Sequence, residues 1–269
     1  MYKIAIHSVP RSGSTWLGTI FNSHPNVSFR YQPLFSYAFK DYLHLNSTTA
    51  DIDSFFDAIK ESDDAFINQL ENIQDGRVPK FQKDTRVTHS CYKEVRYHHL
   101  LENMLKQSAD LKLILLIRNP LAVLYSWSRA PKEFKAEEGW LLEEEWLSAA
   151  KKNLNRAEEY NGYLKWKESA LLFQNLKSNY PNQVFLLNYQ ELLKNTSLMI
   201  HRLFRFVDLT MHEQTLQFIK DSQTIHQSDA YSVFKKRITD EDWKELPSTI
   251  IDTIKNDLKS TSLELYLNA

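Results

Sequence analysis

The chain has 269 residues, of which 42% are hydrophobic and 25% are charged, a composition typical of one globular domain with an ample core. Its formal net charge of −1 argues against a general nucleic-acid binder, so any anion site must come from a local concentration of positive charge. The lone Cys91 excludes an internal disulfide framework, and the longest aliphatic run, residues 111–117, is far shorter than the ~20 residues of a membrane-spanning helix.

The first expected element is a buried strand that leads through a tight turn into a helix. Ile4, Ala5 and Ile6 form an apolar run with two β-branched side chains, which is typical of a buried strand, and Pro10 ends it. Apolar residues then recur at helical spacing up to a His-Pro pair: Trp16, Leu17, Ile20 and Phe21. The pattern predicts a strand–turn–helix unit at the start of the chain.

The turn, residues 10–15, has the composition of an anion-binding loop. The unpaired amides of the first helical turn and the positive end of the helix dipole would point at one spot, and Ser and Thr hydroxyls add donors. Arg11 places a fork-shaped cation beside that spot, and Gly13 is one of only five glycines. Because the turn lacks the Gly-Lys-[Ser/Thr] ending of a Walker A loop, it favours a doubly charged group held without a metal.

The next part of the chain combines a strand with helical segments. A short strand is expected at residues 27–29. Several aromatic side chains in residues 36–50 predict a helix or a lid-like segment, and residues 51–75 predict an amphipathic helical pair whose acidic outer face we interpret as solvated surface. We therefore expect a helical insertion at about residues 36–75 within a single domain spanning 1–269.

The middle of the chain contains the clearest strand. Residues 92–96 predict a short strand, followed by a helix through residues 100–105. The aliphatic run at residues 111–117 is typical of a central parallel strand that is covered on both faces. It delivers Arg118 to its carboxyl end, where ligands of open α/β sheets bind, and residues 121–127 restart as a helix.

The remaining pattern completes an alternation of strands and helices. Residues 141–178 predict a long helical region, residues 183–187 another buried strand, and residues 191–207 further helix. This alternation predicts a three-layer α/β fold, with a P-loop-like parallel sheet flanked by helices.

Two motifs together resemble a known family. PRSGSTWL followed by FNSHPNV resembles the 5′-phosphosulfate loop of sulfotransferases that use 3′-phosphoadenosine-5′-phosphosulfate (PAPS), in a form similar to carbohydrate and protein-tyrosine sulfotransferases. In LILLIRNPLAVLYSWSR, an Arg at a strand end and a Ser eight residues later resemble the family's 3′-phosphate motif. The resemblance implies the sulfotransferase fold, PAPS as donor, 3′-phosphoadenosine 5′-phosphate (PAP) as product, and these donor-binding residues: Arg11, Ser12, Gly13, Ser14, Thr15, Trp16, Arg118 and Ser126.

A later run resembles the family's basic loop over the nucleotide more weakly. It extends from Ser228 to the basic triplet Lys235-Lys236-Arg237 and on to Trp243. Ser228 and Lys235 are the candidate nucleotide contacts there. A basic surface loop without a ligand is the alternative interpretation.

Sulfuryl transfer needs a bound donor, charge stabilisation, an in-line acceptor hydroxyl and a base for its proton. Positioning and electrostatics dominate, as in phosphoryl transfer, and Arg11 with the loop amides would neutralise charge on the leaving phosphate. No metal-binding cluster is evident in the sequence, and we expect none. The nucleotide kinases that share this strand–loop–helix start are the alternative enzyme class, and the missing Walker lysine argues against them.

The general base, the residue that takes the proton of the acceptor hydroxyl, is where this sequence departs from the family. The resemblance places a Glu of the carbohydrate and tyrosine enzymes at Gln32, between Tyr31 and Pro33, and an amide has no useful basicity. Either Gln32 replaces a native Glu, or another group serves. Glu94 is the first substitute, and three histidines are further candidates: His89, His98 and His99.

The acceptor and the location of the protein follow only as expectations. By resemblance we expect a carbohydrate hydroxyl, with a small molecule, a tyrosine, or a catalytically impaired nucleotide-binding protein of the same fold as alternatives. We expect no nucleic-acid partner and no membrane span. Because the first strand begins almost at the N-terminus and leaves no room for a signal peptide, we expect a cytoplasmic protein.

Overall fold

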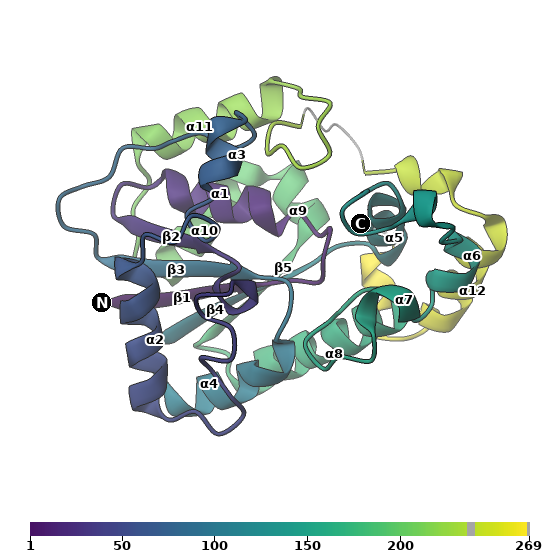
Figure 1. Cartoon of the computed structure of the whole chain (residues 1–269), viewed down its shortest axis with the longest axis horizontal. Helices are drawn as coiled ribbons and strands as arrows, with labels where there is room; N and C mark the ends of the chain where they lie inside the picture. Colours follow the sequence, from purple (N-terminus) through teal and green to yellow (C-terminus); the bar gives the residue numbers. More distant parts are fainter. Residues whose placement is uncertain (236–239, 268–269) are drawn as a thin grey trace.

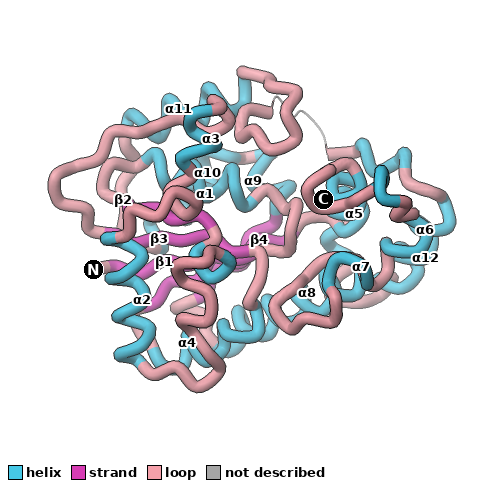
Figure 2. Tube along the Cα trace, viewed as in Figure 1, coloured by secondary structure: helices cyan, strands magenta, loops and turns pink. Residues whose placement is uncertain are grey.

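The computed structural model describes residues 1–235 and 240–267, and its centre is a parallel sheet (Figures 1 and 2). Within this described part, five strands lie in the order β2-β3-β1-β4-β5, and every neighbouring pair is parallel. The strands are β1 (Tyr2–His7), β2 (Val27–Tyr31), β3 (His89–Glu94), β4 (Leu111–Ile117) and β5 (Val184–Asn188). The expected α/β fold with a parallel sheet is confirmed.

Helices cover both faces of the sheet and extend beyond its carboxyl end (Figure 1). One face is covered by α1 (Ser14–Ser23), α3 (Leu70–Gln74), α9 (Tyr189–Lys194), α10 (Thr196–Phe206) and α11 (Glu213–Thr224). The opposite face is covered by α2 (Thr49–Glu61), α4 (Leu101–Gln107) and α8 (Tyr163–Asn179). At the carboxyl end lie α5 (Pro120–Ser128), α6 (Leu142–Glu145), α7 (Ala150–Asn153) and α12 (Ser248–Leu258). Short 3₁₀ turns are η1 (Pro33–Phe35), η2 (His98–Leu100), η3 (Ala136–Glu138), η4 (Asp242–Glu245) and η5 (Glu264–Tyr266).

Two hydrophobic clusters, one on each face, hold these layers together. Because successive side chains of a strand point to opposite faces, Ile114 and Leu116 of β4 join the cluster with α1, whereas Leu113 and Leu115 join the other. All four are buried. This explains why an interior parallel strand has a continuous apolar sequence rather than an alternating one.

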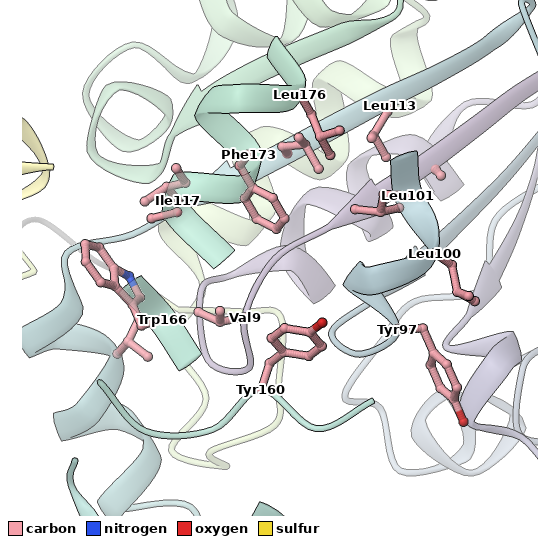
Figure 3. Close-up of a cluster of buried hydrophobic side chains, with 14 of the residues drawn as sticks. Val9, Tyr97, Leu100, Leu101, Leu113, Ile117, Tyr160, Trp166, Phe173 and Leu176 are labelled. Atoms are coloured by element: carbon pink, nitrogen blue, oxygen red, sulfur yellow. The ribbon is translucent and has the colours of Figure 1, made fainter. Parts of the chain in front are cut away.

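The larger cluster also fixes the loop that follows β1. Figure 3 shows Val9, from this loop, among the buried rings of Tyr160 and Trp166. The Trp166 indole N–H donates to the carbonyl of Arg118 at 2.9 Å. The core therefore positions the backbone at the ends of both β1 and β4.

The segment before and within α2 differs in part from expectation. Residues 36–46 form turns and not a helix. The helical pair is present as α2 and α3, but the second helix is only five residues long because Gln69, at its start, has a left-handed backbone with φ 56°. The apolar face of α2 belongs to the main core, and these residues pack there: Ile52, Phe55, Phe56 and Ile59.

Two further predictions were wrong in their bounds. The strand expected at residues 92–96 is β3, which starts at His89 because His89 pairs with both β1 and β2. The long helical region expected at residues 141–178 is divided into α6, α7 and α8. The Asn153 side-chain amide donates to the carbonyls of Ser148 and Asn161, at 2.8 and 2.9 Å, which folds residues 154–162 into a loop in place of a helix.

Candidate active site

A cavity of about 440 Å³ opens at the carboxyl edge of the sheet. The loop from β1 to α1 forms one side, and residues after β3, β4 and β5 complete it. Gly13 precedes α1 with φ 86°, and a Cβ there would come within 2.3 Å of the Tyr189 ring, so only glycine fits. The first turn of α1, with its unpaired amides, consequently faces the cavity.

The structure brings most of the predicted donor loop to this cavity. The lining includes Arg11, Gly13, Ser14, Thr15 and Trp16. Ser12 is buried behind the lining, and its hydroxyl has no hydrogen-bond partner among the described residues. The Trp16 indole is anchored to α11, where its N–H donates to Ser222 Oγ at 2.9 Å.

Arg11 connects the donor loop with the second predicted motif. Its Nε donates to Ser126 Oγ at 3.2 Å, and Nη2 donates to the Ala230 carbonyl at 3.2 Å. The guanidinium also lies over the Tyr231 ring, 5.4 Å from the centroid. Three segments distant in sequence therefore meet at one cation.

Arg118 lines the cavity, is almost completely buried and is already bound to a carboxylate. Its Nε donates to Asp240 Oδ2 at 2.7 Å, a second bond joins Nη2 to Asp240 Oδ1, and Nη1 donates to the Arg11 carbonyl at 2.5 Å. Gln190 donates to the same Asp240 oxygen at 3.2 Å. Sequence analysis missed Asp240, because no local pattern links it to a strand end more than a hundred residues earlier.

The late basic loop reaches the cavity only in part. Lys235 lines the cavity, and its Nζ donates to the carbonyls of Gln227 and Asp229 at 3.0 and 2.5 Å. Ser228 is exposed and is not one of the lining residues. Lys236 and Arg237 lie outside the described residues.

Gln32 lies in the cavity wall within a buried polar network. Its backbone is left-handed, with φ 45°, which turns the chain from β2 into η1. Its Oε1 accepts a hydrogen bond from Arg96 Nη1 at 2.9 Å, and Arg96 Nε donates to Glu159 at 2.9 Å. Gln32 is thus held firmly, with its side-chain oxygen already occupied.

The other predicted proton acceptors lie outside this lining. Glu94 points to the face of β3 opposite α1, where its Oε1 accepts from the Val95 N–H at 3.1 Å, and burial raises the pKa of its carboxyl. His89 stacks on Tyr2 at the amino end of the strand. His98 lies 3.1 Å from His7, ring nitrogen to ring nitrogen, and none of the three candidate histidines lines the cavity in the described structure.

Sequence analysis missed six charged residues that line the cavity: Glu71, Lys93, Arg96, Lys132, Glu133 and Lys152. Lys93, the neighbour of Glu94, points to the α1 face, and its Nζ lies 4.3 Å from the Tyr31 ring centroid. Burial lowers the pKa of Lys93. Glu71 and Glu133 add carboxylates. The alternation of β3 predicts that Lys93 and Glu94 point to opposite faces, but only the packing shows that Lys93 is on the α1 face.

Comparison with known proteins agrees with this site. A family model described as a sulfotransferase domain matches residues 2–266. No curated protein matches the chain. The match of the family model over residues 2–266 shows that the chain belongs to the PAPS-dependent sulfotransferase family, and the predicted family is confirmed.

Solved structures share the fold at low sequence identity. Mouse sulfotransferase SULT7A1 complexed with PAP is 14% identical, with 99% of this chain and 87% of that chain covered and a TM-score of 0.57. Retinol dehydratase in complex with androsterone and PAP is 15% identical, with 97% and 82% covered and a TM-score of 0.55. Both are PAP complexes of this fold.

Two further observations concern partners of other kinds. No helix in residues 1–235 or 240–267 has the length and apolar character needed to cross a membrane. In the same residues, no three His, Cys, Asp or Glu side chains are grouped so that they could hold a metal ion.

Proposed function

We propose that the chain transfers the sulfuryl group of PAPS to a hydroxyl of a carbohydrate, using the cavity at the carboxyl edge of the sheet. The observation that supports the donor is that Ser126 and Arg118 both contact Arg11, in the loop that leads into α1, and that all three line the same cavity as the first turn of that helix. Two phosphates separated by a ribose need two anion sites, and this arrangement offers the helix terminus with Arg11 for one and Arg118 with Ser126 for the other.

The rest of the cavity suits the transfer itself. Lys93 and Arg11 are cations beside the helix terminus, where they would stabilise charge on the sulfuryl oxygens and on the leaving phosphate. No covalent intermediate with the protein is required, because the acceptor oxygen displaces the phosphate directly. The sulfur–oxygen bond to the phosphate breaks as the new sulfur–oxygen bond forms.

The part of the lining that comes from residues 32–72 supports a sugar as acceptor. It combines half-exposed rings with amide side chains: Phe35, Phe66, Gln32, Gln69 and Asn72. Rings that stay partly exposed offer flat apolar faces, and amides offer both donors and acceptors to hydroxyls. A purely apolar acceptor would give no hydrogen bond to Gln69 Oε1, a buried oxygen that has no partner among the described residues.

Nucleotide binding tests the donor assignment. By calorimetry, the chain should bind PAP much more tightly than AMP, because only PAP has a 3′-phosphate. Arg118→Ala should remove most of that preference, a loss of about 1.5–3 kcal/mol or roughly 10- to 150-fold.

The control is Arg129→Ala, which removes an exposed arginine outside the cavity lining and should leave both affinities unchanged. Equal affinity of the wild type for PAP and AMP would contradict the assignment.

A second experiment identifies the acceptor. Methyl glycosides, oligosaccharides, phenols and sterols are each incubated with the protein and radiolabelled PAPS, and transfer of the label is measured. Transfer confined to phenols or sterols would exclude the carbohydrate.

A catalytically impaired nucleotide-binding protein is the second candidate, and Gln32 is the observation that favours it. An amide stands where the related enzymes have a carboxylate, and it lies in the cavity wall. PAP binding without transfer to any acceptor in the screen would support this candidate.

A further inference from the structure

The proposed transfer needs a group that takes the proton of the acceptor hydroxyl, and the following inference rests on that proposal. Gln32 cannot serve, because an amide is not basic and its Oε1 already accepts a hydrogen bond from Arg96. Glu94 and the candidate histidines are not among the described residues that line the cavity. The acceptor of the proton must therefore be sought among groups that do face it.

Two carboxylates line the cavity in the described part of the chain, Glu71 and Glu133. Glu71 belongs to the open mouth, because 78% of its side chain is exposed and Arg77, its ion-pair partner, is 3.8 Å away. Glu133 is more enclosed, with 24% of its side chain exposed, and one of its oxygens lies 2.7 Å from Lys152 Nζ. An enclosed carboxylate held by a cation is better placed than a solvated one to meet a bound hydroxyl.

The backbone around Glu133 is anchored on two sides. Its N–H donates to the Ala130 carbonyl at 2.8 Å, and the N–H of Lys132 donates to the Tyr231 hydroxyl at 2.9 Å. The turn follows α5, whose Ser126 contacts Arg11. One short segment thus extends from a donor-site contact to Glu133, so the carboxylate has a defined place relative to the donor loop.

Glu133 and Gln32 line the same cavity. Burial, and next the negative charge of Glu133, raise the pKa of Tyr31, the residue before Gln32. The same carboxylate attracts the cations Lys93 and Arg96. These electrostatic effects agree with the shared lining, to which all four side chains belong.

The remaining titratable groups of this region are less suited to take a proton. Lys93 could act as a base only when neutral, but the negative charge of a bound donor favours its cation. Tyr31 and Tyr231 have raised pKa values, chiefly through burial, so their hydroxyls stay protonated. Among these groups, the enclosed carboxylate of Glu133 is the one suited to accept the proton.

We propose that Glu133 is the general base of this enzyme, a role that its relatives' motif assigns to the position of Gln32. In the step, the acceptor oxygen forms a bond to the sulfur, the bond from the sulfur to the 5′-phosphate oxygen breaks, and the acceptor proton moves to the Glu133 carboxylate. PAP leaves with the electron pair of the broken bond, and Lys152 keeps the carboxylate in place. Proton transfer of this kind contributes roughly 10²- to 10⁴-fold to rate.

The experiment compares wild type, Glu133→Gln, Glu133→Ala and the matched control Glu168→Gln, which changes an exposed, ion-paired glutamate outside the cavity lining. Radiolabelled PAPS is the donor, and two probes are the acceptors: methyl β-D-glucopyranoside, whose hydroxyls are weakly acidic, and p-nitrophenol, which is largely ionised at mildly alkaline pH. An ionised acceptor needs no base, so the two probes separate proton transfer from binding. PAP affinity is measured for each variant by calorimetry.

Glu133→Gln should lower turnover with the glucoside by roughly 10²- to 10⁴-fold, lower turnover with p-nitrophenol much less, and leave PAP affinity within about twofold. Added formate should restore part of the activity of Glu133→Ala, which a merely structural role would not allow. Glu168→Gln should resemble wild type.

Several results would overturn the assignment of Glu133. These are unchanged turnover in Glu133→Gln, an equal loss with both probes, a loss confined to acceptor KM, or a rise of 10²-fold or more in Gln32→Glu. If the wild type neither binds PAP nor transfers sulfate to any probe, the proposed function itself fails, and the base with it.

Discussion

Arg118 shows how a residue predicted to bind a phosphate can already be engaged by the protein. Its guanidinium makes a bidentate pair with Asp240, and both side chains are about 5% exposed. A buried arginine without such a partner would be costly, and so the carboxylate stabilises the nucleotide-free protein. A 3′-phosphate at this place would compete with Asp240 for the same N–H groups.

We predict that Asp240→Asn strengthens PAP binding while it weakens the free protein. Removing the charge leaves Arg118 less well compensated, and breaking a buried pair costs about 3–5 kcal/mol when one partner is lost, less when an amide still accepts one bond. PAP would then supply the missing negative charge. Thermal unfolding should show a lower Tm without nucleotide and a larger rise in Tm with PAP than in the wild type.

The opposite effect of Asp240→Asn on PAP affinity would contradict this prediction. If Asp240→Asn lowers the affinity for PAP, Asp240 holds Arg118 in place for the phosphate and does not compete with it. AMP serves as the control ligand, because it lacks the 3′-phosphate and should bind both proteins alike.

At the scale of elements, α1 depends on close approach to the edge strand β2. A Cβ on Gly18 would lie 2.5 Å from Phe29 Cζ, so a side chain there would push the helix from the sheet. Since the donor loop ends at the start of α1, the position of this helix also sets the direction of its first amides.

We predict that Gly18→Ala destabilises the protein by about 1–3 kcal/mol, although alanine favours a helix by about 1 kcal/mol over glycine. Overpacking against the buried Phe29 ring should outweigh the gain in propensity. Urea unfolding of the variant measures the effect.

The double variant Gly18→Ala/Phe29→Leu provides the control. The smaller side chain should recover part of the lost stability, because it makes room for the added methyl group. If the alanine variant is as stable as the wild type, α1 can shift without penalty, contrary to the close packing described.

At the scale of the whole molecule, buried histidines link stability to pH. Burial lowers the pKa of His7 to about 3 and the pKa of His98 well below its ordinary value. Both rings are neutral in the folded protein, whereas in the unfolded chain they take up protons below about pH 6.5. Stability is therefore complete above that pH and is lost as the pH falls, although the raised pKa of Glu94 opposes part of the loss.

We predict that the free energy of unfolding falls between about pH 6.5 and pH 5, by up to about 1.4 kcal/mol per pH unit for each histidine. His98→Phe keeps a ring against Tyr160 and removes one of these titrations. Its stability should therefore fall less steeply with acid than that of the wild type, as measured by urea unfolding at several pH values. Equal slopes in the two proteins would contradict the assignment.

The sequence by itself was sufficient for the strand–turn–helix start, the aliphatic strand before Arg118, and the family. These features depend on residues within one or two turns of each other, so hydrophobic period and turn chemistry predict them locally. Strand β3 was harder, because His89 and Ser90 are polar and belong to the strand only through their pairing with β1 and β2. The loop after α7 was missed for a similar reason, since Asn153 ends the helix by binding Asn161.

Only the tertiary structure decided which charges meet in the cavity. The pairs Arg118–Asp240 and Glu133–Lys152 join residues from separate segments of the chain. The orientations of Lys93 and Glu94 depend on strand register, since a shift by one residue exchanges the two faces. No local pattern encodes such contacts, because they arise from the way distant segments pack against one sheet. The sequence thus determined the fold and the turn that leads into α1, and packing decided which charged side chains line the cavity.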